Sequence, residues 1–206
     1  MVPGAVIADL DILLNAPSRT LAAGCGDLLA KLSAYEDWRL AHEVKGEEFD
    51  EVAVAMTRLP AEYVVHAARA IRDRRPAAIR LVVRGLIVSG LAVEVVGTSR
   101  PVSGSEHKFS HALDMLSNRP AMHGEQVAVG TILSLYLHQD HWQRVKRALE
   151  IIGAPTTLKA LGVDKEIAVR AMLHAPKIRP GRYTIFQHIN IDRRLAEEAI
   201  TSTGVD

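Results

Sequence analysis

Residues 76–96 read PAAIRLVVRGLIVSGLAVEVV. The proline at position 76 fits the first turn of a helix, where its missing N–H is one that the helix leaves unbonded anyway. Apolar residues fall on nearly every side of the helix that this pattern predicts, which is typical of a helix surrounded by other elements. The sequence therefore predicts a long helix at the centre of a helical domain.

Helical periodicity continues on both sides of this segment. Apolar residues recur at spacings of three and four, and prolines and glycines separate one periodic stretch from the next. Ser105 is a candidate cap for one of these helices. The helices expected from this pattern span residues 27–43, 60–73, 105–116 and about 123–138, followed by three or four short helices in the last third of the chain. The fold class is therefore mainly α, with little β structure.

The N-terminal segment follows a different pattern. Residues 5–13, AVIADLDIL, suggest a β-strand, and Asn15 with Pro17 suggests the start of the helix after it. A weaker alternation occurs at Tyr183–Phe186. A single strand exposes unpaired backbone groups on both edges, so we expect this one to be the last strand of a sheet upstream. The expected organisation is a remnant of an α/β domain at 1–15 and a helical domain at 16–206, as if the chain were cut at a domain junction.

Composition excludes several classes of protein. The formal net charge of the 206 residues is +1, which gives no basic surface for nucleic acid. Cys25 is the only cysteine, so no intrachain disulfide can form, and a reducing cytoplasm is the expected location. No run of 18 uncharged apolar residues is present, which argues against an integral membrane protein.

Three stretches carry groups that can bind a metal ion. His107 and His111 are four residues apart and share one helix face, a spacing that also arises by chance on helix surfaces. His123 begins the next helix, and the eight residues from 115 to 122 can bring it back to His107 if they run partly extended, at about 3.3 Å each. Asp27 follows two nearby glycines and offers a carboxylate oxygen. Two imidazoles and one carboxylate with an open position are the ligand types of a catalytic zinc site.

Several longer segments resemble a known family. They are AGCGDLLAK (23–31), DWRLAH (37–42), SRPVSGSEHKFSHALD (99–114), HGEQVAVGT (123–131), IRPGRYTI (178–185) and TGV (203–205). In order and spacing they resemble glycerol-1-phosphate dehydrogenases, chiefly archaeal, within the superfamily of dehydroquinate synthase, glycerol dehydrogenase and iron-containing alcohol dehydrogenases. The resemblance implies an all-helical metal-binding domain that follows an N-terminal nucleotide-binding α/β domain.

The resemblance also implies site residues and a reaction. Asp27, His107 and His123 correspond to the metal ligands, usually of zinc, with nickel or iron as alternatives. Asp27 and His111 correspond to residues that contact the substrate and take part in catalysis. The implied reaction is the NAD(P)H-dependent reduction of dihydroxyacetone phosphate to sn-glycerol 1-phosphate for membrane phospholipid (ether lipid) synthesis, by a homo-oligomer.

One part of the family pattern has no counterpart here. The family's glycine-rich pyrophosphate loop belongs to the nucleotide-binding domain, and none of the glycines here follows a strand in the pattern Gly-x-Gly-x-x-Gly. No cofactor-binding residue is therefore assigned in this chain. NAD(P)H is expected to bind to the missing N-terminal domain or to a separate nucleotide-binding chain, and we expect the truncated chain to be inactive alone.

Other residues admit two interpretations each. Arg100 and Lys108 are either phosphate partners or solvated surface charges. Glu106 and Glu125 either orient the ligand histidines or are charges favoured at helix starts. Cys25 is either a ligand or a small buried thiol, and the pair His138 and His141 is either a chelating pair or a solvated helix end.

Two functional rivals also remain at this level. A lyase similar to dehydroquinate synthase shares the histidine spacing but normally has glutamate where Asp27 stands. A non-catalytic helical remnant or interaction domain is the rival from a different class, and it would bind neither metal nor triose phosphate.

Overall fold

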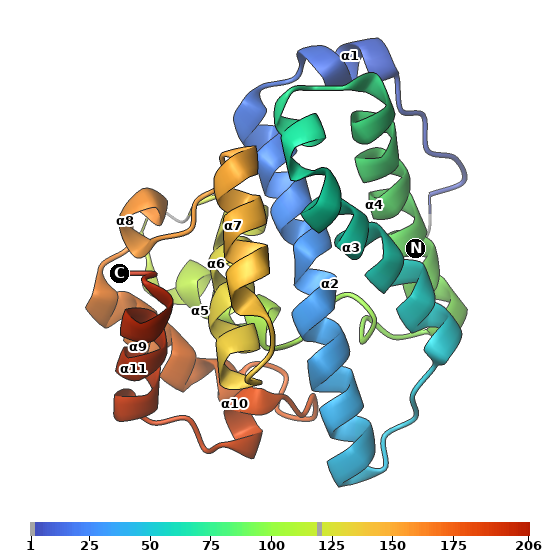
Figure 1. Cartoon of the computed structure of the whole chain (residues 1–206). Coiled ribbons are helices and arrows are strands. Elements are labelled where there is room, and N and C mark those ends of the chain that lie inside the picture. Colours follow the sequence, from blue (N-terminus) through green and yellow to red (C-terminus); the bar gives the residue numbers. More distant parts are fainter. Residues whose placement is uncertain (1–2, 119–120) are drawn as a thin grey trace.

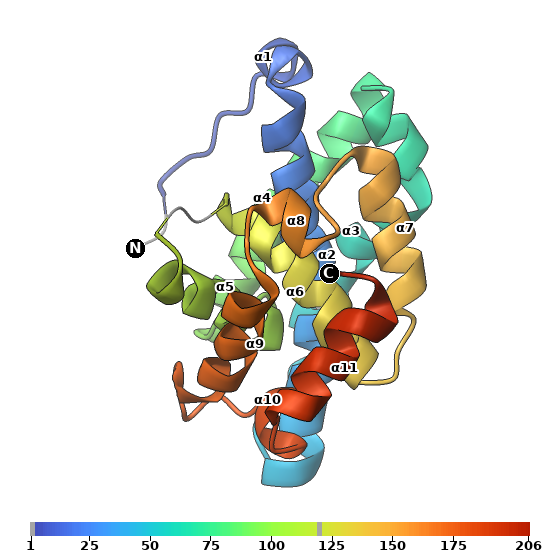
Figure 2. The same cartoon turned by 90° about the vertical axis from the view of Figure 1, so that its left-hand side faces the viewer.

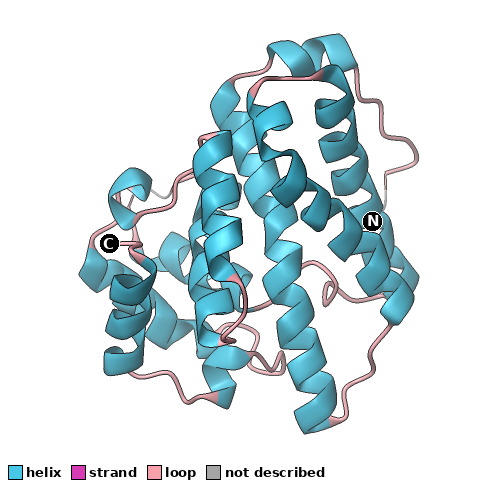
Figure 3. Ribbon diagram, in the orientation of Figure 1, coloured by secondary structure: helices cyan, strands magenta, loops and turns pink. Residues whose placement is uncertain are grey.

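The computed structural model describes residues 3–118 and 121–206, and these residues form helices and loops without a strand (Figures 1 and 3). The mainly α fold class is therefore confirmed. The helices are α1 (Leu10–Asn15), α2 (Ser18–Lys45), α3 (Glu51–Arg72), α4 (Pro76–Val96), α5 (Ser105–Leu116), α6 (His123–Leu137), α7 (Trp142–Ile152), α8 (Leu158–Leu161), α9 (Lys165–His174), the 3₁₀ turn η1 (Ala175–Lys177), α10 (Ile185–His188) and α11 (Arg193–Thr203).

The centre of the molecule is α6. Residues 124–135 of this helix are all buried, and α2, α5, α7 and α11 pack around it. The long helix α2 runs down the molecule beside α6, whereas α5 and α9 lie on the opposite side (Figures 1 and 2). A helix that is apolar on every side is stable only where neighbours cover every side. Helix α6 has small or apolar residues over most of its length, and its neighbours cover it on every side.

The helix at 76–96 forms with the bounds that the sequence predicts, but it is not central. It packs mainly against α3, at the edge of the molecule (Figure 1). Leu81, Leu91 and Val95 are 41%, 48% and 61% exposed. The predicted central position was wrong because apolar composition shows which faces can be buried, while only the arrangement of neighbouring helices decides which faces are covered.

The predicted N-terminal strand was also wrong. Its second half forms α1, and Asp9 caps this helix by accepting hydrogen bonds from the backbone N–H groups of Asp11 and Ile12, at 2.9 and 3.2 Å. A strand satisfies its backbone only beside another strand, and none occurs in the described ranges. Helix α1 satisfies its first amides locally. Asn15 accordingly ends α1 instead of capping the next helix.

The alternation at Tyr183–Phe186 does not produce a strand either. Thr184 and Gln187 form a capping box at the N-terminus of the short helix α10. Their side chains bond to backbone N–H groups that the first turn of a helix leaves free, which favours a helix here. The division of the chain at residue 15 into two domains stays a prediction.

Two other boundaries differ from the sequence expectation. Helix α2 begins at Ser18, ahead of the predicted start at Asp27, and Pro60 lies inside α3 instead of opening it. A proline inside a helix removes one backbone hydrogen bond. Pro60 lies where α3 and α4 approach closely, since a Cβ added at Gly85 would be 2.7 Å from the Pro60 Cβ.

The predicted cap at Ser105 was wrong. Ser105 is the first residue of α5, and Gly104 occupies the cap position. Among the helices that the structure describes, none combines the length and hydropathy needed to cross a membrane.

Candidate metal centre

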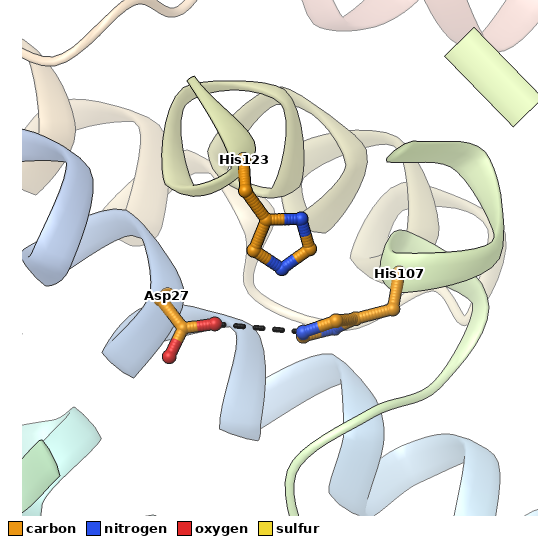
Figure 4. Close-up of side chains that lie close together, drawn as sticks. All are labelled: Asp27, His107 and His123. Carbon is orange, nitrogen blue, oxygen red and sulfur yellow. Dashed lines mark ion pairs between the residues drawn. The ribbon is translucent and has the colours of Figure 1, made fainter. Parts of the chain in front are cut away.

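Asp27, His107 and His123 converge from three helices. They come from α2, α5 and α6, and one possible ligand atom from each lies within 4.8 Å of the others. His107 Nε2 is 3.4 Å from Asp27 Oδ1, and the two imidazole centroids are 5.0 Å apart. Figure 4 shows the two imidazoles and the carboxylate directed toward a common point. The structure thus brings together the three residues that the sequence pattern singled out.

The three side chains fit a divalent metal ion. Ligand atoms at 2.0–2.2 Å from a tetrahedral zinc ion are about 3.4 Å from one another. The separation of His107 and Asp27 already has this value. His123 is the most exposed of the three, so its side chain can turn to close the remaining distance of at most about 1.4 Å. Three protein ligands would leave the fourth position of a tetrahedral ion open.

Lys31 holds the carboxylate of Asp27. The Lys31 side chain is 3% exposed, and its Nζ donates to Asp27 Oδ2 at 2.9 Å, which leaves Oδ1 directed at His107. Burial by itself raises the pKa of Asp27, but the charge of Lys31 and the contact with His107 outweigh it and hold this pKa well below its ordinary value. The carboxylate is therefore ionised at neutral pH. Sequence reasoning did not single out Lys31, although an Asp–Lys pair four residues apart on one helix was the available signal.

The carboxylate of Glu106 contacts the other side of His107. The distance from Glu106 Oε1 to His107 Nδ1 is 2.7 Å, so Nε2 is the nitrogen left facing Asp27. Burial lowers the pKa of His107, while the hydrogen bonds to Asp27 and Glu106 raise it, and the net shift is upward. His107 thus lies between two carboxylates.

His123 has a neutral partner. Its Nδ1 is 3.1 Å from Ser110 Oγ, and that hydroxyl donates to Gln126 Oε1 at 2.7 Å. Because the Ser110 proton is used in this way, the Ser110 oxygen is the acceptor for a proton on His123 Nδ1. Burial, followed by the charge of His107, lowers the pKa of His123. Both histidines therefore use Nδ1 for protein contacts and leave Nε2 for a metal ion.

His111 lies beside the ligand group but is not a member of it. It is one turn beyond His107 on α5, and its ring centroid is 6.0 Å from that of His123. Burial and the charges of His107 and Arg179 lower the pKa of His111. A neutral imidazole at this place can exchange hydrogen bonds with a molecule bound in the open position.

The two basic candidates are internal side chains. Arg100 is 3% exposed and donates both to the carboxylate of Glu47 and to the carbonyl of Tyr183. Lys108 is 2% exposed and donates to the carbonyl of Arg182 at 2.5 Å, and burial lowers its pKa to about 8. Their reading as solvated surface charges was wrong, and both already have partners within the protein.

Three further candidates lie outside the cluster. Cys25 is fully buried, as its reading as a structural thiol predicts. His138 Nε2 is 3.0 Å from Asp37 Oδ1 and its side chain is 7% exposed, so His138 is neither a chelating partner of His141 nor part of a solvated helix end. In the described ranges Glu125 pairs with Arg19 and has no hydrogen bond to either candidate ligand histidine, whereas Glu106 lies at hydrogen-bonding distance from His107.

Sequence comparison finds similar proteins that are named as dehydrogenases. No family model matches the chain. It is 49% identical over 203 residues to the glycerol-1-phosphate dehydrogenase [NAD(P)+] of Pyrococcus horikoshii, which is 98% of this chain and 59% of that protein. The protein of that name from Hyperthermus butylicus is 45% identical over 205 residues, again 59% of its length. The chain thus spans about three fifths of the length of these relatives.

Solved structures show the same fold at lower identity. A probable glycerol dehydrogenase from Sinorhizobium meliloti superposes with a TM-score of 0.74 at 23% identity, over 98% of this chain and 59% of that one. The glycerol dehydrogenase of Schizosaccharomyces pombe gives a TM-score of 0.72 at 20% identity, over 95% of this chain and 52% of that one. At this identity the likeness establishes the fold.

Proposed function

This chain belongs to the glycerol-1-phosphate dehydrogenase family, and on that premise we propose that it forms the metal- and substrate-binding part of such an enzyme. The proposed reaction is the reduction of dihydroxyacetone phosphate to sn-glycerol 1-phosphate with NAD(P)H. The observation that carries the proposal is the convergence of Asp27, His107 and His123 from three separate helices. A purely structural helical domain has no need of such a cluster.

Each residue has a defined task in this proposal. Asp27, His107 and His123 hold a divalent ion, with zinc the preferred choice for two nitrogens and one oxygen. A bound zinc ion polarises a ketone and stabilises the negative charge that develops on its oxygen. His111, kept neutral by its lowered pKa, orients the substrate hydroxyl and passes a proton to or from it. The nicotinamide binds to a nucleotide-binding part that the described helices do not supply.

The wider setting follows from the product. sn-Glycerol 1-phosphate is the proposed precursor of membrane phospholipid, made in the cytoplasm by a homo-oligomer. The lyase rival has less support, because the relatives named above are dehydrogenases and aspartate stands where that lyase normally has glutamate.

The metal site is tested by zinc content. We expect the purified chain to retain one zinc ion per molecule after dialysis, and Asp27→Ala, His107→Ala and His123→Ala to lose it, because two protein ligands hold zinc poorly. His141→Ala is the matched control, since this exposed histidine lies outside the cluster. Full zinc retention by all three variants would overturn the site, and retention by one would remove that residue from it.

The substrate is tested by calorimetry on the zinc-loaded chain. Dihydroxyacetone phosphate and sn-glycerol 1-phosphate should bind, and the enantiomer sn-glycerol 3-phosphate should bind more weakly. Removal of zinc should abolish binding, because the open coordination position accepts a substrate oxygen. A chain that keeps zinc but binds neither triose phosphate nor sn-glycerol 1-phosphate would contradict the proposed substrate and favour the non-catalytic rival.

A further inference from the structure

The two candidate ligand histidines differ in the charge of the group that contacts their Nδ1. His123 meets the neutral hydroxyl of Ser110, whereas His107 meets the carboxylate of Glu106. The Glu106 side chain is 0% exposed. An ionised carboxylate is costly to bury, so a wholly buried one needs several donors or a specific role.

Hydrogen-bonding partners surround the buried carboxylate of Glu106 and offset the cost of removing it from water. Its Oε1 accepts from the backbone N–H of Gly104 at 2.6 Å and lies 2.7 Å from His107 Nδ1. Its Oε2 accepts from Ser33 Oγ at 2.8 Å. These three contacts link α2 and the loop before α5 to the imidazole of His107. The side chain is therefore fixed before any ion binds.

If Glu106 served only to stabilise the N-terminus of α5, it would not need to contact His107. Glu125 occupies the first turn of α6 as Glu106 occupies that of α5. Glu125 accepts from the backbone N–H of Met122 at 2.9 Å and otherwise pairs with Arg19, whose side chain is 65% exposed. Among the described residues, its hydrogen bonds go to the helix N-terminus and to Arg19, and none goes to the histidine two residues before it. Glu106 likewise accepts from the backbone N–H of Gly104, and it contacts a histidine as well.

We propose that Glu106 is a positioning residue for the metal site: it holds His107 with Nδ1 protonated and Nε2 directed at the ion, and its negative charge strengthens His107 as a ligand. This inference rests on the metal site proposed above. Carboxylates that accept the second N–H of a ligand histidine commonly contribute 10–100-fold to metal affinity. Ser110, an uncharged acceptor, does the same for His123 with a smaller effect.

The variant Glu106→Gln separates charge from geometry. Its amide oxygen can accept from both Gly104 N and His107 Nδ1, while its NH₂ donates to Ser33 Oγ. In the variant, the single proton of the Ser33 hydroxyl can turn to the carbonyl oxygen of Ala30, 3.0 Å away. The groups that Glu106 contacts thus keep partners, and the variant differs from the wild type by the lost charge and one added amide N–H. Glu125→Gln is the matched control, because it removes a carboxylate from the same turn of the neighbouring ligand helix.

The affinity for Zn²⁺ is measured on the full chain by competition with a chromophoric chelator. Glu106→Gln should bind Zn²⁺ about tenfold more weakly than the wild type, and Glu125→Gln should change by less than about twofold. The visible absorption of the Co²⁺-loaded protein reports the ligand field directly. Its band positions should shift in Glu106→Gln and not in Glu125→Gln, a difference that general loss of stability would not produce.

The outcomes distinguish this inference from the proposed function. Failure of the wild type to bind Zn²⁺ would overturn the metal site itself. Wild-type affinity and an unchanged Co²⁺ spectrum in Glu106→Gln would overturn the positioning role and leave the site standing. If Glu106→Gln does not fold, imidazole ¹⁵N NMR of the zinc-loaded wild type decides the matter. Nδ1 of His107 must then carry a proton, and metal bound at Nδ1 would overturn the inference.

Discussion

Gly26 and Gly124 touch backbone to backbone where α2 crosses α6. A Cβ added at Gly26 would lie 2.3 Å from the carbonyl oxygen of Gly124, and one added at Gly124 would lie 2.0 Å from that of Ala23. Each glycine adjoins a candidate ligand in the chain, Asp27 after the first and His123 before the second. The absence of two side chains therefore sets the distance between the candidate ligands Asp27 and His123 on these two helices.

Substitution Gly124→Ala should separate these helices. The new methyl group has no space, so we expect a loss of about 1–3 kcal/mol in the free energy of unfolding, measured by chemical denaturation. Zinc binding should weaken too, because metal sites tolerate ligand shifts of only about 0.2 Å. Gly90→Ala is the control, because a Cβ added at Gly90 would meet no atom of another element within 4 Å. Alanine at this position should stabilise α4 by about 0.5–1 kcal/mol. A Gly124→Ala protein with wild-type stability would contradict this account.

Asp37 should be one of the most sensitive polar positions. One of its carboxylate oxygens accepts from the backbone N–H and the hydroxyl of Ser105, at 2.5 and 2.6 Å, and the other from Ile185 N and His138 Nε2, at 2.7 and 3.0 Å. Asp37→Asn replaces one acceptor by a donor, so we expect a loss of about 2–4 kcal/mol on denaturant unfolding at pH 7. Asp164→Asn, at an exposed helix cap without a side-chain hydrogen bond, should have little effect.

The same carboxylate predicts a pH dependence. Burial raises the pKa of Asp37, but the hydrogen bond and charge of His138 and the bonds from Ser105 outweigh it, so the pKa in the folded state is lowered. Its contribution is therefore fully present above its unfolded pKa of about 3.9, and it is lost as pH falls through the lower folded value. The stability gap between the wild type and Asp37→Asn should narrow on acidification below about pH 4. A gap that stays constant down to pH 2 would show that the charge is not responsible.

Cys25 should be chemically inert in the folded chain. It is fully buried, and burial raises its pKa to about 12. The thiolate, which is the reactive form, is thus absent at pH 8, and iodoacetamide should label the native protein far more slowly than the unfolded one, whose thiol has a pKa of about 8.5. Mass spectrometry with and without denaturant measures both rates. Rapid labelling of the native protein would show that this part of α2 opens readily.

His111→Ala should separate substrate binding from metal binding. His111 lies outside the ligand group, so the variant should retain zinc. Loss of one hydrogen bond to a charged or polarised substrate should weaken dihydroxyacetone phosphate binding by about 10–100-fold, as measured by calorimetry. Loss of zinc from this variant would instead make His111 a ligand.

The amino-acid sequence by itself predicted the helical class, the bounds of the helix at 76–96, the end of the helix at Leu116, and the three residues that converge in the candidate site. These features depend on short-range chemistry. Prolines and glycines mark helix ends within a few residues, and a segment such as SEHKFSH (105–111) keeps its groups at fixed spacing on one helix. Such signals are legible without knowledge of distant parts of the chain.

Only the tertiary structure decided which faces and side chains meet. It placed α6 rather than α4 at the centre, and it brought Asp27 to His107, Ser33 to Glu106 and Ser110 to His123. Apolar periodicity gives the faces that can be buried, but the neighbour that covers each face comes from packing between segments far apart in the sequence. The orientation of an imidazole depends in the same way on partners that only the assembled helices bring within hydrogen-bonding distance.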